Sequence, residues 1–198
     1  MQPEVRKVAE ADFPCRFGAF RIYGFEAEIS GKRESVVALR LGELAGEPAP
    51  LVRIHSQCLT GDVFGSLRCD CRAQLELSLE RIAADGRGLL IYEAQEGRGI
   101  GLTNKLKAYE LQDAGADTVE ANEQLGFEAD LRTYQVAVGV LRYFGVNRVR
   151  LLSNNPSKIS ALEEAGIRVE ERVPCRIEPT SSTSAYLRTK KEKLGHIL

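Results

Sequence analysis

The sequence lacks a long apolar run, an excess of charge of either sign and a disulfide-like cysteine pattern. No stretch approaches the roughly 18 consecutive apolar residues of a membrane span, and charged side chains interrupt residues 1–13, where a secretion signal has its apolar core. The 27 basic and 28 acidic residues leave a formal net charge of −1, so no global field attracts nucleic acid or lipid. The odd count of 5 cysteines is unlike a disulfide framework. We expect a cytoplasmic protein without a nucleic-acid or membrane partner.

The arrangement of apolar residues indicates an α/β fold. Up to about residue 56, short β-type runs at 20–25, 36–41 and 51–54 alternate with glycine and proline. Helical stripes and buried-strand runs then alternate. The stripes lie at 75–82, 102–109 and 134–141, with a further helix at 157–165, and the strand runs at 88–92, 149–152 and 167–169. We predict a mixed sheet flanked by helices in a three-layer α/β/α arrangement, with a β-rich N-terminal part and active loops at strand carboxyl ends.

The last residues differ in composition from the rest. Residues 179–184 are proline, serine and threonine, and Lys190, Lys191 and Lys193 make the end basic. We expect a single domain over 1–176 and a polar, basic tail over 177–198 that is partly disordered.

Three of the five cysteines lie within fourteen residues, in the pattern Cys58-x10-Cys69-x-Cys71. Clustered thiolates in a reduced protein are soft ligands that favour zinc. Three ligands without a nearby fourth cysteine match an open, catalytic zinc site; the alternative is a closed site in which His55 is the fourth ligand. Cys15 and Cys175 are expected to be packing residues.

Several collinear motifs resemble the signature of GTP cyclohydrolase II, the first enzyme of riboflavin synthesis. They include RIHSQCLTGD at 53–62, GSLRCDC at 65–71, QEGRGIGL at 95–102 and LLSNNPSK at 151–158. Shorter matches lie at 104–105, 117–122, 125–127 and 193–196, so the resemblance covers nearly the whole chain. It implies a homodimer with one Zn2+ per subunit that takes GTP with Mg2+ and releases formate and pyrophosphate. Two alternatives are ring opening that stops at the formamidopyrimidine and a non-catalytic, zinc-stabilised nucleotide-binding module.

The resemblance also implies roles for single residues. The zinc ligands fall on Cys58, Cys69 and Cys71; the acid-base residue falls on Asp130, the nucleophilic arginine on Arg132 and the active-site tyrosine on Tyr109. Implied contacts to GTP fall on Arg53, Ile54, His55, Ser56, Gln57, Gln74, Glu96, Gly97, Arg98, Thr118, Ser153 and Lys158.

Chemistry leaves some of these roles open. A guanidinium stays protonated near neutral pH, so Arg132 is equally suited to clamping a phosphate. Without the resemblance, Asp130-x-Arg132 would be a helix cap followed by a solvated arginine. The glycine-rich loop 95–101 suits phosphate but lacks the ending of a P-loop, and Arg98, Lys105 and Lys158 are candidate cations for the triphosphate.

Two further features concern recognition of guanine and proton transfer near the metal. Glu120 and Gln124 are candidate readers of the guanine edge. Gln57 stands where the family commonly has Glu, which removes a possible base near the metal.

Overall fold

The computed structural model describes residues 3–29, 31–179, 183–195 and 197, and these form two compact units. Unit 1 comprises Met1–His55, Glu76–Ala94 and Thr133–Cys175, and unit 2 comprises Ser56–Leu75, Gln95–Arg132 and Arg176–Leu198. Because the chain passes repeatedly between them, each unit is assembled from segments distant in sequence.

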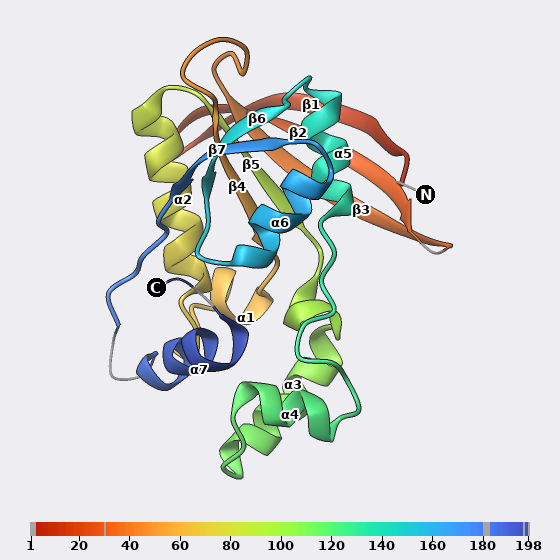
Figure 1. The fold of residues 1–198 in the computed structure, drawn as a ribbon, viewed down its shortest axis with the longest axis vertical. Coiled ribbons are helices and arrows are strands. Elements are labelled where there is room, and N and C mark those ends of the chain that lie inside the picture. Colours follow the sequence, from red (N-terminus) through yellow and green to blue (C-terminus); the bar gives the residue numbers. More distant parts are fainter. Residues whose placement is uncertain (1–2, 30, 180–182, 196, 198) are drawn as a thin grey trace. The chain divides into compact units, whose positions relative to one another are not determined.

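A seven-stranded mixed sheet, in the order β1-β2-β3-β5-β4-β6-β7, dominates unit 1 (Figure 1). β1, β2, β3 and β5 pair antiparallel, whereas β4, β6 and β7 pair parallel. The strands are β1 (Val5–Cys15), β2 (Gly18–Ile29), β3 (Lys32–Leu41), β4 (Leu51–Ser56), β5 (Gly88–Glu93), β6 (Arg148–Leu152) and β7 (Arg168–Val173). The predicted α/β class, with a mixed sheet and a β-rich N-terminal part, is confirmed.

The edge strand β1 is not among the predicted strands. Most of its side chains are exposed or half-buried, and many are charged. A strand at the edge of a sheet needs no continuous apolar face, so its sequence carries no clear alternation to detect.

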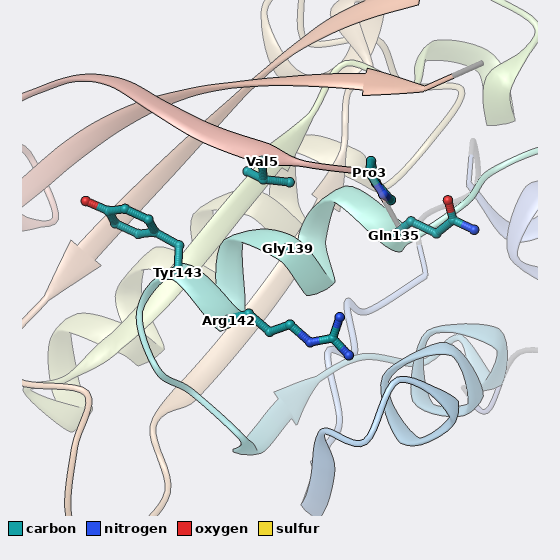
Figure 2. A pocket seen from close by; sticks show the side chains of 6 residues that line it. All are labelled: Pro3, Val5, Gln135, Gly139, Arg142 and Tyr143. Carbon is teal, nitrogen blue, oxygen red and sulfur yellow. The ribbon is translucent and has the colours of Figure 1, made fainter. Parts of the chain in front are cut away.

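Helix α5 (Gln135–Tyr143) supplies much of the core of unit 1. Five of its residues are buried: Val136, Ala137, Val138, Val140 and Leu141. Figure 2 shows β1 passing close to this helix at Gly139, where an added Cβ would lie 2.3 Å from Val5 Cγ2. The pocket drawn there is lined by Pro3, Val5, Gln135, Gly139, Arg142 and Tyr143 and contains none of the predicted site residues.

Two further helices connect strands of the sheet. α2 (Cys71–Asp85) precedes β5 and α6 (Pro156–Glu164) precedes β7, as predicted. Asn155 caps α6 by accepting the Ser157 N–H, and Pro156 occupies the first turn, where its missing N–H costs nothing.

Short helices make up unit 2: α1 (Leu59–Asp62), the 3-10 turn η1 (Glu96–Gly99), α3 (Leu102–Asp113), α4 (Thr118–Gln124) and α7 (Ser184–Leu194). The stripe predicted on α3 does form a helix, but Leu102 and Leu106 are 37% and 48% exposed and Ala108 is its buried residue. α4 was not predicted. Its capping box, in which Asp117 and Glu120 satisfy each other's backbone N–H groups, marks its start.

The C-terminal segment contains the helix α7, where we expected a polar tail. Residues 180–182, 196 and 198, also part of that expectation, lie outside the described residues. The domain boundary at residue 176 stays a prediction. Among the described helices, none combines the length and the apolarity needed to cross a bilayer.

Candidate metal centre

The three predicted cysteine ligands converge in unit 2. Their sulfur atoms all lie within 4.8 Å of one another, and Cys58 Sγ is 3.7 Å from Cys69 Sγ. Cys58 precedes α1, where its backbone N–H is accepted by Asp62 at 3.0 Å, and Cys71 begins α2. Two helix starts joined by a short loop therefore bring the sulfurs to one point.

Gly61 leaves the space that the sulfurs occupy. A Cβ added there would lie 2.8 Å from Cys69 Sγ, closer than real Cβ contacts, and 3.1 Å from Cys58 Sγ, which is tighter than most of them. Three soft sulfur donors within 4.8 Å of one another fit a thiophilic ion such as zinc. This group of cysteines can hold a metal ion.

The three thiols do not titrate alike. Hydrogen bonds with Cys69 and Cys71, together with the charge of Lys105, lower the pKa of Cys58 against the effect of burial. The hydrogen bond with Cys58 and burial raise the pKa of Cys69, although the hydrogen bond with Cys71 opposes them. Hydrogen bonds with Cys58 and Cys69, together with burial, raise the pKa of Cys71. A negative charge is therefore favoured on Cys58 before any metal binds.

Lys105, on α3, reaches the sulfur of Cys58. Its ammonium donates to Cys58 Sγ at 3.1 Å, to Thr60 Oγ1 at 2.9 Å and to Glu96 Oε1 at 2.7 Å. Burial disfavours the charge, but the hydrogen bond to Glu96 and the Cys58 thiolate raise the pKa of Lys105 above its usual value. The ammonium that we expected to face a triphosphate is directed at the metal centre.

The carboxylate of Glu96 holds this arrangement together. Its Oε2 accepts the Leu59 N–H at the start of α1 at 2.7 Å, while Oε1 accepts from Lys105 and from the Gly97 N–H. Glu96 is buried, so both oxygens are satisfied by the protein. An acidic residue predicted to contact GTP thus positions the segment that carries Cys58.

Tyr109, the predicted active-site tyrosine, belongs to the same network. Its hydroxyl lies 3.1 Å from Thr60 Oγ1, and the Arg68 guanidinium lies 4.8 Å from the centre of its ring. Thr60 therefore links Tyr109 to Lys105 and also contacts Cys58 Sγ directly at 3.7 Å. Thr60 was not singled out from the sequence, although it lies within the motif at 53–62.

A buried ion pair supports the other two cysteines. Asp70, between Cys69 and Cys71, accepts from Lys190 of α7 at 2.8 Å and from Gln74 at 2.5 Å. Gln74, predicted to contact GTP, is thus engaged within the protein. No sequence signal indicates a pairing across 120 positions, and Lys190 was expected to lie in a solvated tail.

Asp130 and Arg132, the two predicted catalytic residues of the 128–134 loop, pair with each other. Arg132 donates from Nε at 2.8 Å and from Nη2 at 2.5 Å, and its backbone N–H also reaches Asp130. Burial alone would raise the pKa of Asp130, but the Arg132 hydrogen bonds and charge lower it below the usual value. Asp130 is not a helix cap, because α5 begins at Gln135.

Arg98 has the features of a residue held for a ligand. It is a non-glycine residue in the left-handed region, with φ 61° and ψ 35°. Its Nη1 and Nη2 are buried and have no hydrogen-bond partner among the described residues. Gly97, beside it, is also left-handed, and the Arg98 carbonyl accepts the Leu131 N–H, which ties η1 to the loop of Asp130.

Comparison with known proteins identifies the family. A family model described as GTP cyclohydrolase II matches residues 6–174. The chain belongs to the GTP cyclohydrolase II family. The GTP cyclohydrolase-2 of Shewanella amazonensis is 50% identical over 194 residues, covering 98% of this chain and 94% of that protein. The chain is therefore an enzyme of the GTP cyclohydrolase II type.

Other relatives are longer. The riboflavin biosynthesis protein RibBA of Bacillus subtilis is 53% identical over 195 residues, and the chain spans 48% of its length. A crystal structure of RibBX, a two-domain 3,4-dihydroxy-2-butanone 4-phosphate synthase from A. baumannii, matches with a TM-score of 0.50. That match covers 88% of this chain and 41% of the other at 20% identity, which supports the fold alone.

A second group of the residues implied for the GTP cyclohydrolase II family lies in unit 1, at the ends of β4 and β6. Lys158 is buried, donates to the Ile54 carbonyl at 2.7 Å and lies 5.6 Å from the centre of the Tyr134 ring. Arg53 donates to the Leu152 carbonyl at 3.0 Å. Arg53, within β4, thus contacts the last residue of β6, and Lys158, on α6, contacts the backbone of β4.

The neighbours of this cation pair are also engaged within the protein. Ser153 Oγ accepts the Asn155 N–H at 3.0 Å, and the His55 ring stacks on Tyr92 with its centre 5.4 Å away. His55, the alternative fourth metal ligand, thus has its ring face held by an aromatic partner. Ser56 ends β4, and Gln57 follows it in the segment that leads to Cys58.

The remaining predicted contacts lie at the start of α4. Thr118 is its first residue. The Glu120 carboxylate accepts a hydrogen bond from the Asp117 N–H and forms an ion pair with Lys193 at 2.9 Å. Lys193 also pairs with Asp117. Glu120 therefore caps a helix and anchors α7 in this structure; Gln124, the other candidate reader of guanine, is exposed near the end of α4.

Proposed function

We propose that the chain hydrolyses GTP with zinc held by Cys58, Cys69 and Cys71, opening the guanine imidazole ring at C8. Formate and pyrophosphate leave, and the product is 2,5-diamino-6-hydroxy-4-(5-phosphoribosylamino)pyrimidine. One water is consumed for each of three steps: ring opening, loss of formate and cleavage between the α and β phosphates. In this proposal the reaction is the first step of riboflavin biosynthesis, and Mg2+ accompanies the triphosphate.

The convergence of three thiols around Gly61 is the observation that carries the proposal. Zinc bound there would supply Lewis-acid activation of water for hydrolysis at a purine carbon. Membership of the GTP cyclohydrolase II family supports the choice of GTP, as do relatives named for riboflavin biosynthesis.

The chain's own residues would divide the remaining work. Asp130, kept ionised by Arg132, suits the role of proton acceptor better than that of proton donor. The Tyr109 hydroxyl lies 3.1 Å from Thr60 Oγ1, which supports a role for it as a proton donor near the metal centre. Arg98 and Arg132 suit phosphate oxygens, because a guanidinium can donate two parallel hydrogen bonds.

The implied GTP contacts in unit 1 are part of the same proposal. Ile54 and His55 lie in the second half of β4 and Ser153 directly follows β6, close to strand carboxyl ends, where α/β proteins bind nucleotides. Arg53 and Lys158 contact the backbone of these two strands. We further propose that the enzyme works as a homodimer. Val63, Phe64 and Leu67 are 60%, 74% and 73% exposed, which supports an association surface on unit 2.

The test is a product analysis with zinc-loaded protein, GTP and Mg2+. We expect equal amounts of formate and pyrophosphate and a product with the mass of the diaminopyrimidine. A product that retains the formyl group would instead identify the formamidopyrimidine reaction. Unchanged GTP would contradict the proposal and favour a nucleotide-binding module.

The matched variant is Cys69→Ser, which removes one soft ligand and keeps the size of the side chain. We expect the rate of formate release to fall at least a hundredfold while most of the fold is retained. The reason is that a serine hydroxyl binds zinc less tightly than the thiolate it replaces. Cys15→Ser, a cysteine outside the cluster, is the control and keeps activity. Normal turnover by Cys69→Ser would contradict the metal assignment.

A further inference from the structure

The surroundings of Lys105 differ from those expected of a lysine that binds a triphosphate. As a triphosphate cation it would present free N–H groups to phosphate oxygens. In the structure its ammonium has three acceptors from the protein: Cys58 Sγ, Thr60 Oγ1 and Glu96 Oε1. An ammonium has three N–H donors, so these contacts use its full capacity.

We propose that Lys105 is a positioning residue of the metal centre: its ammonium, fixed by Glu96, donates to the Cys58 thiolate and weakens that sulfur as a metal donor. This inference rests on the proposed function of the three cysteines. It assigns Lys105 to the metal and not to the nucleotide.

The geometry restricts Lys105 to this role. Its side chain is 12% exposed and that of Glu96 is 7% exposed, and their ion pair is 2.7 Å long. Glu96 is itself held by the Leu59 N–H at the start of α1, the helix that Cys58 precedes. Lys105 and Glu96 therefore both contact the short segment of residues 58–60, so the N–H···S contact is set by the fold.

The electrostatic consequence follows from the donor set. Zinc with three thiolates carries a net charge near −1, which reduces its ability to polarise a water or a carbonyl. A hydrogen bond from a cation withdraws electron density from one sulfur, and groups beyond the direct ligands tune metal sites in this way. Lys105 thus offsets part of the excess charge at Cys58.

The same contacts give Lys105 a second effect, on Tyr109. Thr60 Oγ1 accepts from Lys105 and lies 3.1 Å from the Tyr109 hydroxyl, and the ammonium lies 5.7 Å from the centre of the tyrosine ring. A change at Lys105 would therefore alter a metal donor and the orientation of Tyr109 together. Both effects act on turnover more than on the binding of GTP.

The test uses cobalt in place of zinc, because a sulfur-to-Co2+ charge-transfer band reports the electron density on the thiolates. Lys105→Met keeps the length of the side chain and removes the charge and the donors. We expect its band to move to lower energy than in the unchanged protein. Lys105→Arg keeps a cationic donor, so its band should stay close to the energy of the band in the unchanged protein. Lys107→Met, an exposed lysine on the same helix, is the control and leaves the band in place.

Kinetics of the zinc-loaded proteins separate the two possible roles. We expect Lys105→Met to lower kcat for GTP at least tenfold and to change KM less than threefold. A large rise in KM with an unshifted cobalt band would overturn the inference and assign Lys105 to the triphosphate. Because Lys105→Met leaves Glu96 buried without its cation, Lys105→Met/Glu96→Gln serves as a second variant with the pair neutralised, and it should show the same band shift.

The outcomes for the inference and for the proposed function differ. An unchanged protein that gives no sulfur-to-cobalt band would contradict the metal centre itself. A second outcome is a normal band and normal GTP turnover in the unchanged protein, with an unshifted band in Lys105→Met and in Lys105→Met/Glu96→Gln. That outcome would overturn the role of Lys105 alone.

Discussion

Arg98 combines two features that proteins rarely keep without a function. Its left-handed backbone is costly for a residue with a side chain, and its buried terminal nitrogens have no hydrogen-bond partner among the described residues. Such costs are concentrated at sites that bind ligands. A guanidinium held in this state is prepared to receive an anion, which agrees with its proposed role toward the phosphates of GTP.

Two substitutions at Arg98 separate its strain from its function. Both Arg98→Gly and Arg98→Ala remove the guanidinium, so both should lower turnover of GTP at least tenfold. Arg98→Gly also relieves the left-handed strain, and we expect it to be about 1 kcal/mol more stable than Arg98→Ala in urea unfolding. Equal stability of the two variants would contradict the strained backbone.

The single residues also show where sequence reasoning succeeds and where it stops. The cysteine pattern was sufficient to predict the cluster, because ligand type and spacing limit the chemistry. The partners of the charged residues were not predictable. Lys105 was expected to face a phosphate, and the fold places its ammonium at a thiolate. Glu96 and Glu120 likewise hold backbone N–H groups in the structure.

Among the elements, α7 connects the C-terminal segment to the residues around the metal centre. Lys190 pairs with Asp70, between two of the cysteines, and Lys193 pairs with Asp117 and Glu120 at the start of α4. The helix therefore attaches the C-terminal segment at two separate points of unit 2. Periodicity did not predict it, because its composition is polar.

The Asp70–Lys190 pair makes part of the stability dependent on pH. Burial alone would raise the pKa of Asp70, but the Lys190 charge and its hydrogen bonds lower it below the value of a free aspartate, about 4. A lowered folded-state pKa stabilises the fold above the unfolded-state value, and this contribution is lost as pH falls through the folded-state pKa. We therefore expect Lys190→Met to be destabilised by about 3 kcal/mol at pH 7 and the difference to narrow below about pH 4.

The measurement is urea unfolding of this variant and of Lys191→Met at several pH values. Lys191 is the exposed neighbour of Lys190, so the comparison subtracts the acid sensitivity that both proteins share, including loss of metal. A difference that stays constant from pH 7 to pH 3 would contradict the ionic origin of the effect.

The elements differ in how readily the sequence predicts them. The buried strands β4, β5 and β6 and the helix α5 were predictable, because their apolar residues are continuous or periodic. β1 and α4 were not predicted, since one is a mostly exposed edge strand and the other is a short helix defined by its cap. Packing against the rest of the chain, which no local pattern encodes, decides such elements.

At the scale of the whole molecule, the region that matches the GTP cyclohydrolase II family contains the cysteine cluster. The family match covers residues 6–174, and all three cysteines, with Asp130, Arg132 and Tyr109, lie within it. The predicted residues are distributed over both units: the metal centre belongs to unit 2, and the buried cations Arg53 and Lys158 belong to unit 1. The proposed reaction therefore draws on residues of both units.

The most direct test of the whole account is X-ray absorption at the zinc edge on the zinc-loaded protein. We predict one zinc per chain with three sulfur neighbours at about 2.3 Å and one lighter neighbour that GTP perturbs. The number of sulfur neighbours should fall to two in Cys69→Ser. Fewer than three sulfurs around zinc in the unchanged protein, or a fourth protein ligand that GTP does not affect, would contradict a catalytic centre built on Cys58, Cys69 and Cys71.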